Sequence, residues 1–392
     1  MTRRARRWPG IVLALAALVL VTWWAARPTL RSAALLMDMT GAAPSLRPWV
    51  PAKTFEVTTE DVEVPTRHGN VAARLYRSAA PSPPALVVVP GVHGGGVDEP
   101  RFASLSRRIA AAGATVLSAP MPDLRTYRLT PRATDMIEDT TLWMAAQTRY
   151  APDGRVGLIG VSFAGGLALV AAGRPALENH LTAVFALGAH ADLPRAIRYL
   201  CMDAGAPKTL APPHDYGVVL MLRASIPLMV PAEQRAALDA ALVTFLDASS
   251  AEATNREVSE RLFAEARLAE ARFDEPARSL MHAVNTRDVP TLGRLLAPHA
   301  EQIGGDASLS PARSRATHVP VFLLHGVDDN VIPSSESVLL REYLTANGNP
   351  GVEVVLTPLI SHADARKNAR LAEAWRLVRF WTRIWGRFED AR

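Results

Sequence analysis

A single serine, Ser162, stands in the stretch RVGLIGVSFAGGLALVAAG at residues 155–173, between an apolar run and a run of small residues. The β-branched apolar run is typical of a strand and the small residues of a helix, so the chain is expected to turn sharply at the serine. Gly160 and Ala164 are small enough to allow the strained backbone that presents a nucleophilic hydroxyl at such a turn. The usual pattern is G-x-S-x-G, and this chain has alanine, Ala164, in place of the last glycine. The pattern predicts a nucleophile; a serine that only caps the helix is the alternative.

A nucleophilic serine needs groups that stabilise the negative charge developing on the substrate oxygen, and backbone N–H groups in a glycine-rich loop can do this. The loop VHGGGVDEP at residues 92–100 follows the apolar run ALVVVPG and contains the string H-G-G-G. Pro90 holds the place directly after the strand where the histidine of that motif normally stands. We therefore expect the oxyanion donors to be the amides of Phe163, Val92 and Gly94; a glycine turn without a catalytic role is the alternative.

Serine is a weak nucleophile near pH 7, so a histidine base and an orienting carboxylate must accompany it. The run GVEVVLTPLISHAD at residues 351–364 carries His362 near its end, and we predict this histidine to be the base. The run VPVFLLHGVDDNVIP at residues 319–333 carries two candidate acids, of which we prefer Asp329 to Asp328. We expect His325, at the end of the same strand, to shape that loop.

Asp192 is the alternative acid. It lies near the end of LTAVFALGAHADLPR at residues 181–195, which is predicted to be the strand that follows the serine's helix. The choice between Asp192 and Asp329 stays open at the level of sequence.

Strands and helices alternate before the serine, which predicts a parallel sheet with right-handed crossovers. Ligand sites in such sheets form at the carboxyl ends of the strands, where each candidate residue above is found. Residues 55–78 alternate between apolar and polar side chains and predict an antiparallel hairpin at the sheet edge, with its turn at residues 68–70. The expected elements before Ser162 are strands in the run ALVVVPG at 85–91 and at 114–118, helices at 102–112 and 134–148, and the strand at 156–161.

The order of these elements, the turn around Ser162, the loop HGVDDNVIP and the segment SHAD resemble the α/β-hydrolase superfamily, nearest its dienelactone-hydrolase-like and bacterial serine esterase members. The resemblance covers about residues 55–200 and 315–385. It implies an α/β fold with a mostly parallel central sheet and helices on both faces. It also implies Ser162 as nucleophile, Asp329 as acid, because it is the fourth residue after His325, and His362 as base. Serine separates this chain from dienelactone hydrolases proper, which use cysteine.

Between the two matching parts, residues 196–317 have apolar positions at helical spacing and predict a helical insertion that caps the carboxyl edge of the sheet. Its leucines and two of its methionines, Met221 and Met229, either line an acyl pocket or form the core of the insertion. The expected division is a membrane anchor or signal peptide at 1–31, a proline-rich linker at 32–54, the first part of the core at 55–195, the cap at 196–317 and the second part of the core at 318–392.

Residues 8–26, WPGIVLALAALVLVTWWAA, carry no charge. As a helix rising about 1.5 Å per residue they would nearly cover a hydrocarbon core of about 30 Å. Four arginines precede them, which favours a cytoplasmic N-terminus and an extracytoplasmic body, as in a bacterial inner-membrane protein facing the periplasm. A signal peptide cleaved near residues 32–34, with secretion of the body, is the alternative.

The composition, 49% hydrophobic and 21% charged over 392 residues, is typical of an ordered globular protein. The formal net charge is +5, but six arginines precede the first acidic residue, Asp38, and without them the rest of the chain carries −1. Nucleic-acid binding therefore has little electrostatic support. The single cysteine, Cys201, cannot form an internal disulfide and is expected to be structural.

Together these features predict a membrane-anchored serine hydrolase that cleaves small-molecule carboxylic esters through an acyl-enzyme and needs no metal or organic cofactor. Two alternatives stay open. The same triad could act on amides or thioesters or transfer the acyl group, or the chain could be a catalytically silent, anchored binding protein.

Overall fold

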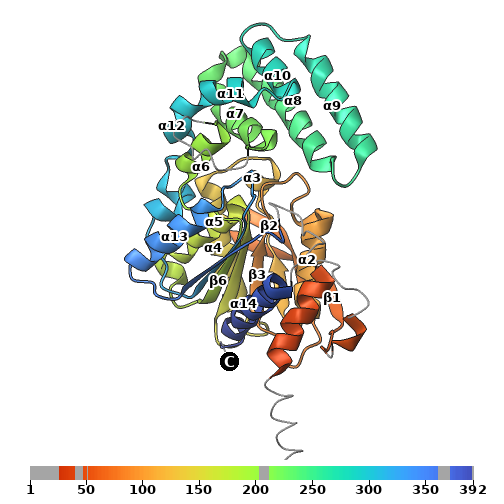
Figure 1. The fold of residues 1–392 in the computed structure, drawn as a ribbon, viewed down its shortest axis with the longest axis vertical. Coiled ribbons are helices and arrows are strands. Elements are labelled where there is room, and N and C mark those ends of the chain that lie inside the picture. Colours follow the sequence, from red (N-terminus) through yellow and green to blue (C-terminus); the bar gives the residue numbers. More distant parts are fainter. Residues whose placement is uncertain (1–25, 40–46, 51, 203–211, 361–370, 391–392) are drawn as a thin grey trace, which may run out of the picture.

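A computed structural model describes residues 26–39, 47–50, 52–202, 212–360 and 371–390. In these residues the strands form one eight-stranded sheet in the order β1-β2-β4-β3-β5-β6-β7-β8 (Figure 1). β1 pairs antiparallel with β2 and β2 antiparallel with β4, and the other neighbours are parallel. The strands are β1 (Val57–Thr66), β2 (Gly69–Ser78), β3 (Ala85–Val89), β4 (Thr115–Ser118), β5 (Val156–Val161), β6 (Leu181–Leu187), β7 (Val321–Gly326) and β8 (Val352–Thr357).

Helices cover both faces of this sheet. Along β3, Val87 and Val89 belong to one apolar core and Leu86 and Val88 to another, because successive side chains of a strand point to opposite faces. The first core is completed by α4 (Pro131–Ala146), α5 (Phe163–Ala172) and α13 (Ser335–Ala346), and the second by α2 (Pro100–Ala111) and α14 (Leu371–Glu389). The predicted α/β class with a mostly parallel sheet is confirmed, and the arrangement fits the α/β-hydrolase fold that the sequence resembles.

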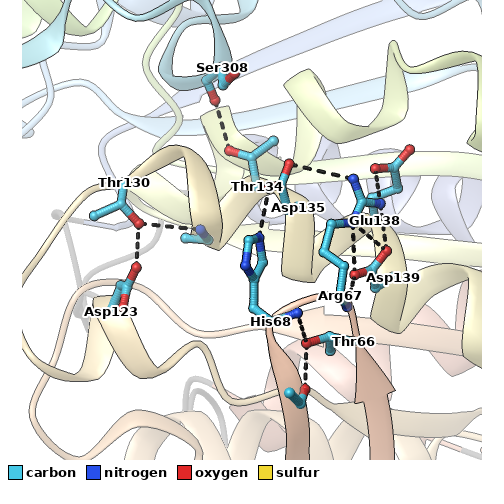
Figure 2. A network of polar contacts seen from close by, with 12 residues as sticks. Thr66, Arg67, His68, Asp123, Thr130, Thr134, Asp135, Glu138, Asp139 and Ser308 are labelled. Carbon is cyan, nitrogen blue, oxygen red and sulfur yellow. Dashed lines mark hydrogen bonds and ion pairs between the residues drawn. The ribbon is translucent and has the colours of Figure 1, made fainter.

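The β1–β2 hairpin is present, with a turn one residue earlier than expected. Thr66 pairs with Gly69, so the two turn residues are Arg67 and His68. Both residues contact α4 (Figure 2). The Arg67 guanidinium lies 2.6 Å from carboxylate oxygens of Glu138 and Asp139, and Nε2 of His68 lies 2.8 Å from Oδ2 of Asp135. These contacts hold the antiparallel edge of the sheet on the rest of the domain.

Residues 26–39, part of which was expected to be a linker, are helical and packed. Ser32 is 2% exposed and Leu35 belongs to the core beneath α14. The Arg31 guanidinium lies 2.5 Å from a carboxylate oxygen of Glu389 and over the ring of Trp385. Figure 1 shows this helix at the end of the molecule away from the helical insertion. Residues 32–39 of the linker expected at 32–54 are thus part of a helix of the folded domain. They are helical because Leu35 can pack in the apolar core that α14 helps to form.

A helical insertion lies between β6 and β7, as predicted, and covers the carboxyl edge of the sheet (Figure 1). Met221 is 2% exposed inside its apolar core and Met229 packs against that core, so both support the insertion itself. Its helices are α6 (Leu193–Leu200), α7 (Asp215–Met229), α8 (Ala232–Ala251), α9 (Arg256–Glu270), α10 (Ala277–Asn285), α11 (Val289–Leu296) and α12 (Ala300–Gly304). The remaining short elements are α3 (Pro122–Arg125) and the 3-10 turns η1 (Arg47–Trp49), η2 (Gly96–Asp98), η3 (Pro175–Leu177), η4 (Ala297–His299), η5 (Ala307–Leu309) and η6 (Pro311–Arg313).

Candidate active site

Ser162 occupies the turn between β5 and α5 in a strained conformation. Its φ and ψ are 59° and −136°, a region that residues with a side chain rarely adopt. Its N–H donates to the carbonyl oxygen of Leu187 in β6, at 2.7 Å, and its own carbonyl accepts from Gly165 N–H at 2.8 Å. The Ser162 hydroxyl makes no capping hydrogen bond to α5. The helix-cap alternative therefore lacks the hydrogen bond that would define it.

Small residues make this turn possible. A Cβ on Gly160 would lie 2.6 Å from the carbonyl oxygen of Ala164 and 2.7 Å from the Cα of Gly165, so β5 and the start of α5 come closer than any side chain allows. Ala164 itself is fully buried with its methyl group accommodated. The departure from G-x-S-x-G is therefore compatible with the turn.

The buried acid of the β7 loop is Asp329. It is 3% exposed, and its Oδ1 accepts hydrogen bonds from the N–H groups of Val331 and Ile332, both at 2.9 Å. Its neighbour Asp328 is exposed to solvent. Because an orienting carboxylate must be fixed and shielded from water, this difference favours Asp329 over Asp328.

His325 shapes the same loop. It is fully buried, with Nδ1 2.7 Å from Ser337 Oγ and Nε2 2.9 Å from the carbonyl oxygen of Ile332. Its Nε2 also lies 3.3 Å from Oδ2 of Asp329. Both ring nitrogens have protein partners, so His325 braces the acid loop as expected.

His362 lies outside the described residues, so the base stays a prediction. β8 ends at Thr357, which is paired with Gly326 at the end of β7, and Val327 N–H donates to the Thr357 carbonyl oxygen at 3.1 Å. The described chain continues to Ile360, two residues before His362. The parallel topology thus brings the ends of β5, β7 and β8 to one edge of the sheet.

Asp192, the alternative acid, caps α6 and pairs with an arginine. Its Oδ1 accepts from Arg195 N–H at 2.9 Å, and its Oδ2 lies 2.5 Å from Nε of Arg313. Burial alone would raise the pKa of this carboxyl group, but the hydrogen bonds from Arg313 and Arg195 lower it below its ordinary value. These contacts account for Asp192 without a catalytic role.

The glycine loop approaches the serine at its first residues. A Cβ on Gly91 would lie 3.1 Å from Cβ and 3.8 Å from Oγ of Ser162, so the loop is in contact with the serine at the residue directly before Val92. A Cβ on Gly94 would instead lie 2.7 Å from the Tyr127 hydroxyl and 2.8 Å from Oδ1 of Asp247. Gly94 therefore lies against the insertion, and Val92 is the better placed of the two predicted loop donors.

Two of the predicted amides are open to a ligand. Within the described ranges, neither Phe163 N–H, at the first residue of α5, nor Val92 N–H has a protein acceptor. By contrast, Gly95 N–H donates to Nδ1 of His93 at 3.0 Å and Gly96 N–H to the His93 carbonyl oxygen at 2.9 Å. A substrate oxygen near Ser162 could thus accept from Phe163 and Val92.

The sequence did not indicate the first turn of α7, which contacts two of these loops. His214 N–H donates to the carbonyl oxygen of Asn330, beside the acid, at 2.8 Å, and the Tyr216 hydroxyl donates to the Val92 carbonyl oxygen at 2.7 Å. The His214 imidazole also lies 2.8 Å from Asp215, and this hydrogen bond raises the pKa of His214. His214 and Asn330, like Tyr216 and Val92, are more than a hundred residues apart in the sequence, so no local pattern could have indicated these two contacts.

In the ranges that the structure describes, no group of three or more histidine, cysteine, aspartate or glutamate residues could hold a metal ion. Nor is any helix in those ranges both long and apolar enough to cross a membrane. Most of the expected anchor, residues 8–25, lies outside them.

No family model matches the sequence, and none of the curated proteins compared matches it either. Among solved structures, the chain is similar to a hyperthermophilic esterase from the archaeon Pyrobaculum calidifontis, with 17% identity, a TM-score of 0.47 and 93% of this chain and 90% of that chain covered. It is also similar to vibralactone cyclase, with 15% identity, a TM-score of 0.46 and coverages of 89% and 84%. An acylaminoacyl peptidase from Pyrococcus horikoshii has 13% identity, a TM-score of 0.45 and coverages of 86% and 42%.

Proposed function

We propose that this chain is a serine hydrolase that cleaves carboxylic esters through an acyl-enzyme, with Ser162 as nucleophile, His362 as base and Asp329 as the orienting acid. The observation that carries the proposal is the left-handed backbone of Ser162, which holds a hydroxyl without a capping role at the carboxyl edge of the sheet. A non-glycine residue keeps such a conformation only where the surroundings enforce it, and active sites are where this strain is concentrated.

In the first half-reaction the His362 imidazole takes the proton of the Ser162 hydroxyl while Oγ bonds to the ester carbonyl carbon. The N–H groups of Phe163 and Val92 stabilise the oxyanion. The tetrahedral intermediate collapses, the imidazolium gives its proton to the leaving alkoxide, and an alcohol departs. Water then attacks the acyl-enzyme with His362 again as base, which releases a carboxylic acid and restores Ser162.

The test is hydrolysis of p-nitrophenyl esters of increasing acyl length by the full chain in detergent. Ser162→Ala is expected to lower kcat/KM by about 10⁴-fold or more, because one member of a triad is lost. Ser104→Ala, which removes a serine hydroxyl on α2 that accepts from Arg108, is the matched control and should keep full activity. Activity that survives Ser162→Ala would exclude this serine as the nucleophile.

Matched amides and thioesters, and added alcohols as acyl acceptors, distinguish the esterase from other enzymes with the same triad. A folded wild-type chain that is inactive on every acyl compound and does not react with a fluorophosphonate would instead support a binding protein.

Residues 8–26 are proposed as an uncleaved membrane anchor, with the body on the extracytoplasmic side. The helix at 26–39 supports retention, because cleavage near residues 32–34 would remove Arg31 and with it the contacts to Glu389 and Trp385. The test is the intact mass of the protein recovered from membranes of the expressing cells. A mature chain that begins near residue 33 in the soluble fraction would contradict the anchor.

A further inference from the structure

The first turn of α7 lies across the ends of the central strands. One of its contacts, His214 N–H to the Asn330 carbonyl, reaches the loop after β7, and the other, the Tyr216 hydroxyl to the Val92 carbonyl, reaches the loop after β3. In the sheet order, β5 and β6 lie between β3 and β7. This turn is therefore bonded to the loops on both sides of β5 and β6, and Ser162 lies at the end of β5.

The glycine loop depends on such contacts because its own residues define its conformation poorly. Three consecutive glycines follow His93, and glycine has more accessible backbone conformations than any other residue. The carbonyl of Gly94 is held by Nε of Arg125 at 3.2 Å, and the carbonyl of His93 by Gly96 N–H. The carbonyl of Val92 is held by the Tyr216 hydroxyl alone among the described residues.

We propose that Tyr216 is a positioning residue for the oxyanion donor: its hydrogen bond to the Val92 carbonyl fixes the backbone of Val92 so that Val92 N–H points to the substrate oxygen. The inference rests on the proposed function. The N–H and C=O of one residue are joined through its φ and ψ, so holding the carbonyl restricts where the amide can point. A donor that is held in place before the reaction costs no reorganisation in the transition state.

The ring of Tyr216 is itself held by Tyr127, a residue of the core that is bonded to the insertion. It packs edge-on against Tyr127, with the ring centroids 6.3 Å apart. The Tyr127 hydroxyl donates to Oδ1 of Asp247 at 2.6 Å and lies 3.0 Å from Oγ of Ser250, both on α8. Phenylalanine at position 216 would keep this packing and remove the hydroxyl, which donates to Val92 and also has a hydrogen-bonding contact with the Ser250 side chain. Ser250→Ala removes the second contact but not the bond to Val92 and should keep wild-type kcat, so the comparison of the two variants isolates the bond to Val92.

The experiment compares Tyr216→Phe with wild type on the preferred p-nitrophenyl ester, with rates expressed per active site titrated by a fluorophosphonate. We expect kcat to fall about fivefold to tenfold with KM unchanged, the size of effect that one neutral hydrogen bond gives. Binding of a trifluoromethyl ketone, whose tetrahedral adduct carries an oxyanion, should weaken by the same factor as kcat/KM. Tyr343→Phe is the control, because its hydroxyl donates to the carbonyl oxygen of Ser314, and it should change neither quantity.

A Tyr216→Phe variant with wild-type kcat and wild-type inhibitor affinity overturns the inference, while the loss of activity in Ser162→Ala still upholds the proposed function. A rise in KM at constant kcat also overturns it, because Tyr216 would then bind substrate rather than aim a donor. If Ser162→Ala retains full activity, the proposed function fails, and the role of Tyr216 fails with it.

Discussion

Replacing Gly160 by alanine tests whether the close approach of β5 and α5 sets the position of the nucleophile. The added Cβ would lie 2.6 Å from the Ala164 carbonyl oxygen and 2.7 Å from the Cα of Gly165, where ordinary contacts begin at 3.4 Å. Both atoms belong to the backbone, so the first turn of α5 must move by most of an ångström. A displacement of about 1 Å in a reacting group costs about 10²-fold in rate, and overpacking of this kind costs about 1–3 kcal/mol of stability.

We therefore expect Gly160→Ala to lower kcat by about 10²-fold and to unfold at a lower urea concentration. The assay is ester hydrolysis at saturating substrate together with urea unfolding followed by circular dichroism. Gly386→Ala is the matched control, because Gly386 lies within α14 and a Cβ there meets nothing within 4 Å. It should keep full activity and be slightly stabilised, since alanine favours the helix by about 0.5–1 kcal/mol. Wild-type kcat and stability in Gly160→Ala would refute the argument that this contact places Ser162.

Three further predictions concern the carboxylates and His214. Asp329→Asn should lower kcat by about 10⁴-fold, while the exposed Asp328→Asn should stay near wild type; equal losses in both would contradict the assignment of the acid. Asp192→Ala should lower the free energy of unfolding by about 1–2 kcal/mol through loss of the α6 cap, with kcat per folded molecule unchanged, as urea unfolding and active-site titration would show. The hydrogen bond to Asp215 raises the pKa of His214, so protonated His214 stabilises the folded state. This stabilisation is complete below the unfolded pKa of about 6.5 and disappears as the pH rises through the folded pKa. The stability difference between wild type and His214→Asn should therefore be larger at pH 5.5 than at pH 8.5, and equal differences would count against this ion pair.

Most of the sheet could be predicted from the sequence because its strands have strong local signals. ALVVV at 85–89 is apolar throughout, and it forms a strand buried on both faces, β3. The hairpin turn was placed one residue late, because the pairing of Thr66 with Gly69 depends on the register of the two strands and Gly69 itself belongs to β2.

The residues missed by sequence reasoning are those that depend on distant partners. The sequence suggested Ser162 through its immediate neighbours, and its resemblance to a known family suggested Asp329 through the spacing from His325. The burial of Asp329 and the exposure of Asp328 give a physical reason for that preference, which adjacent positions in a loop do not reveal. Tyr216 contacts Val92 across 124 positions, so its place above the site follows only from the fold of the insertion. The helix at 26–39 was missed for the same reason, because the surface that it covers is contributed by α14 at the other end of the chain.

The packing of the helix at 26–39 also bears on which side of the domain would face the membrane in an anchored form of the protein. A long linker would leave the domain far from its anchor, whereas here residue 26, at the end of the proposed anchor, already belongs to a helix that is fixed to α14 by Arg31 and by buried side chains. The helix begins at the end of the molecule opposite the insertion (Figure 1). With residues 8–26 in a bilayer, as proposed, the serine edge would face the aqueous compartment instead of the lipid headgroups. Such an enzyme would take its esters from solution.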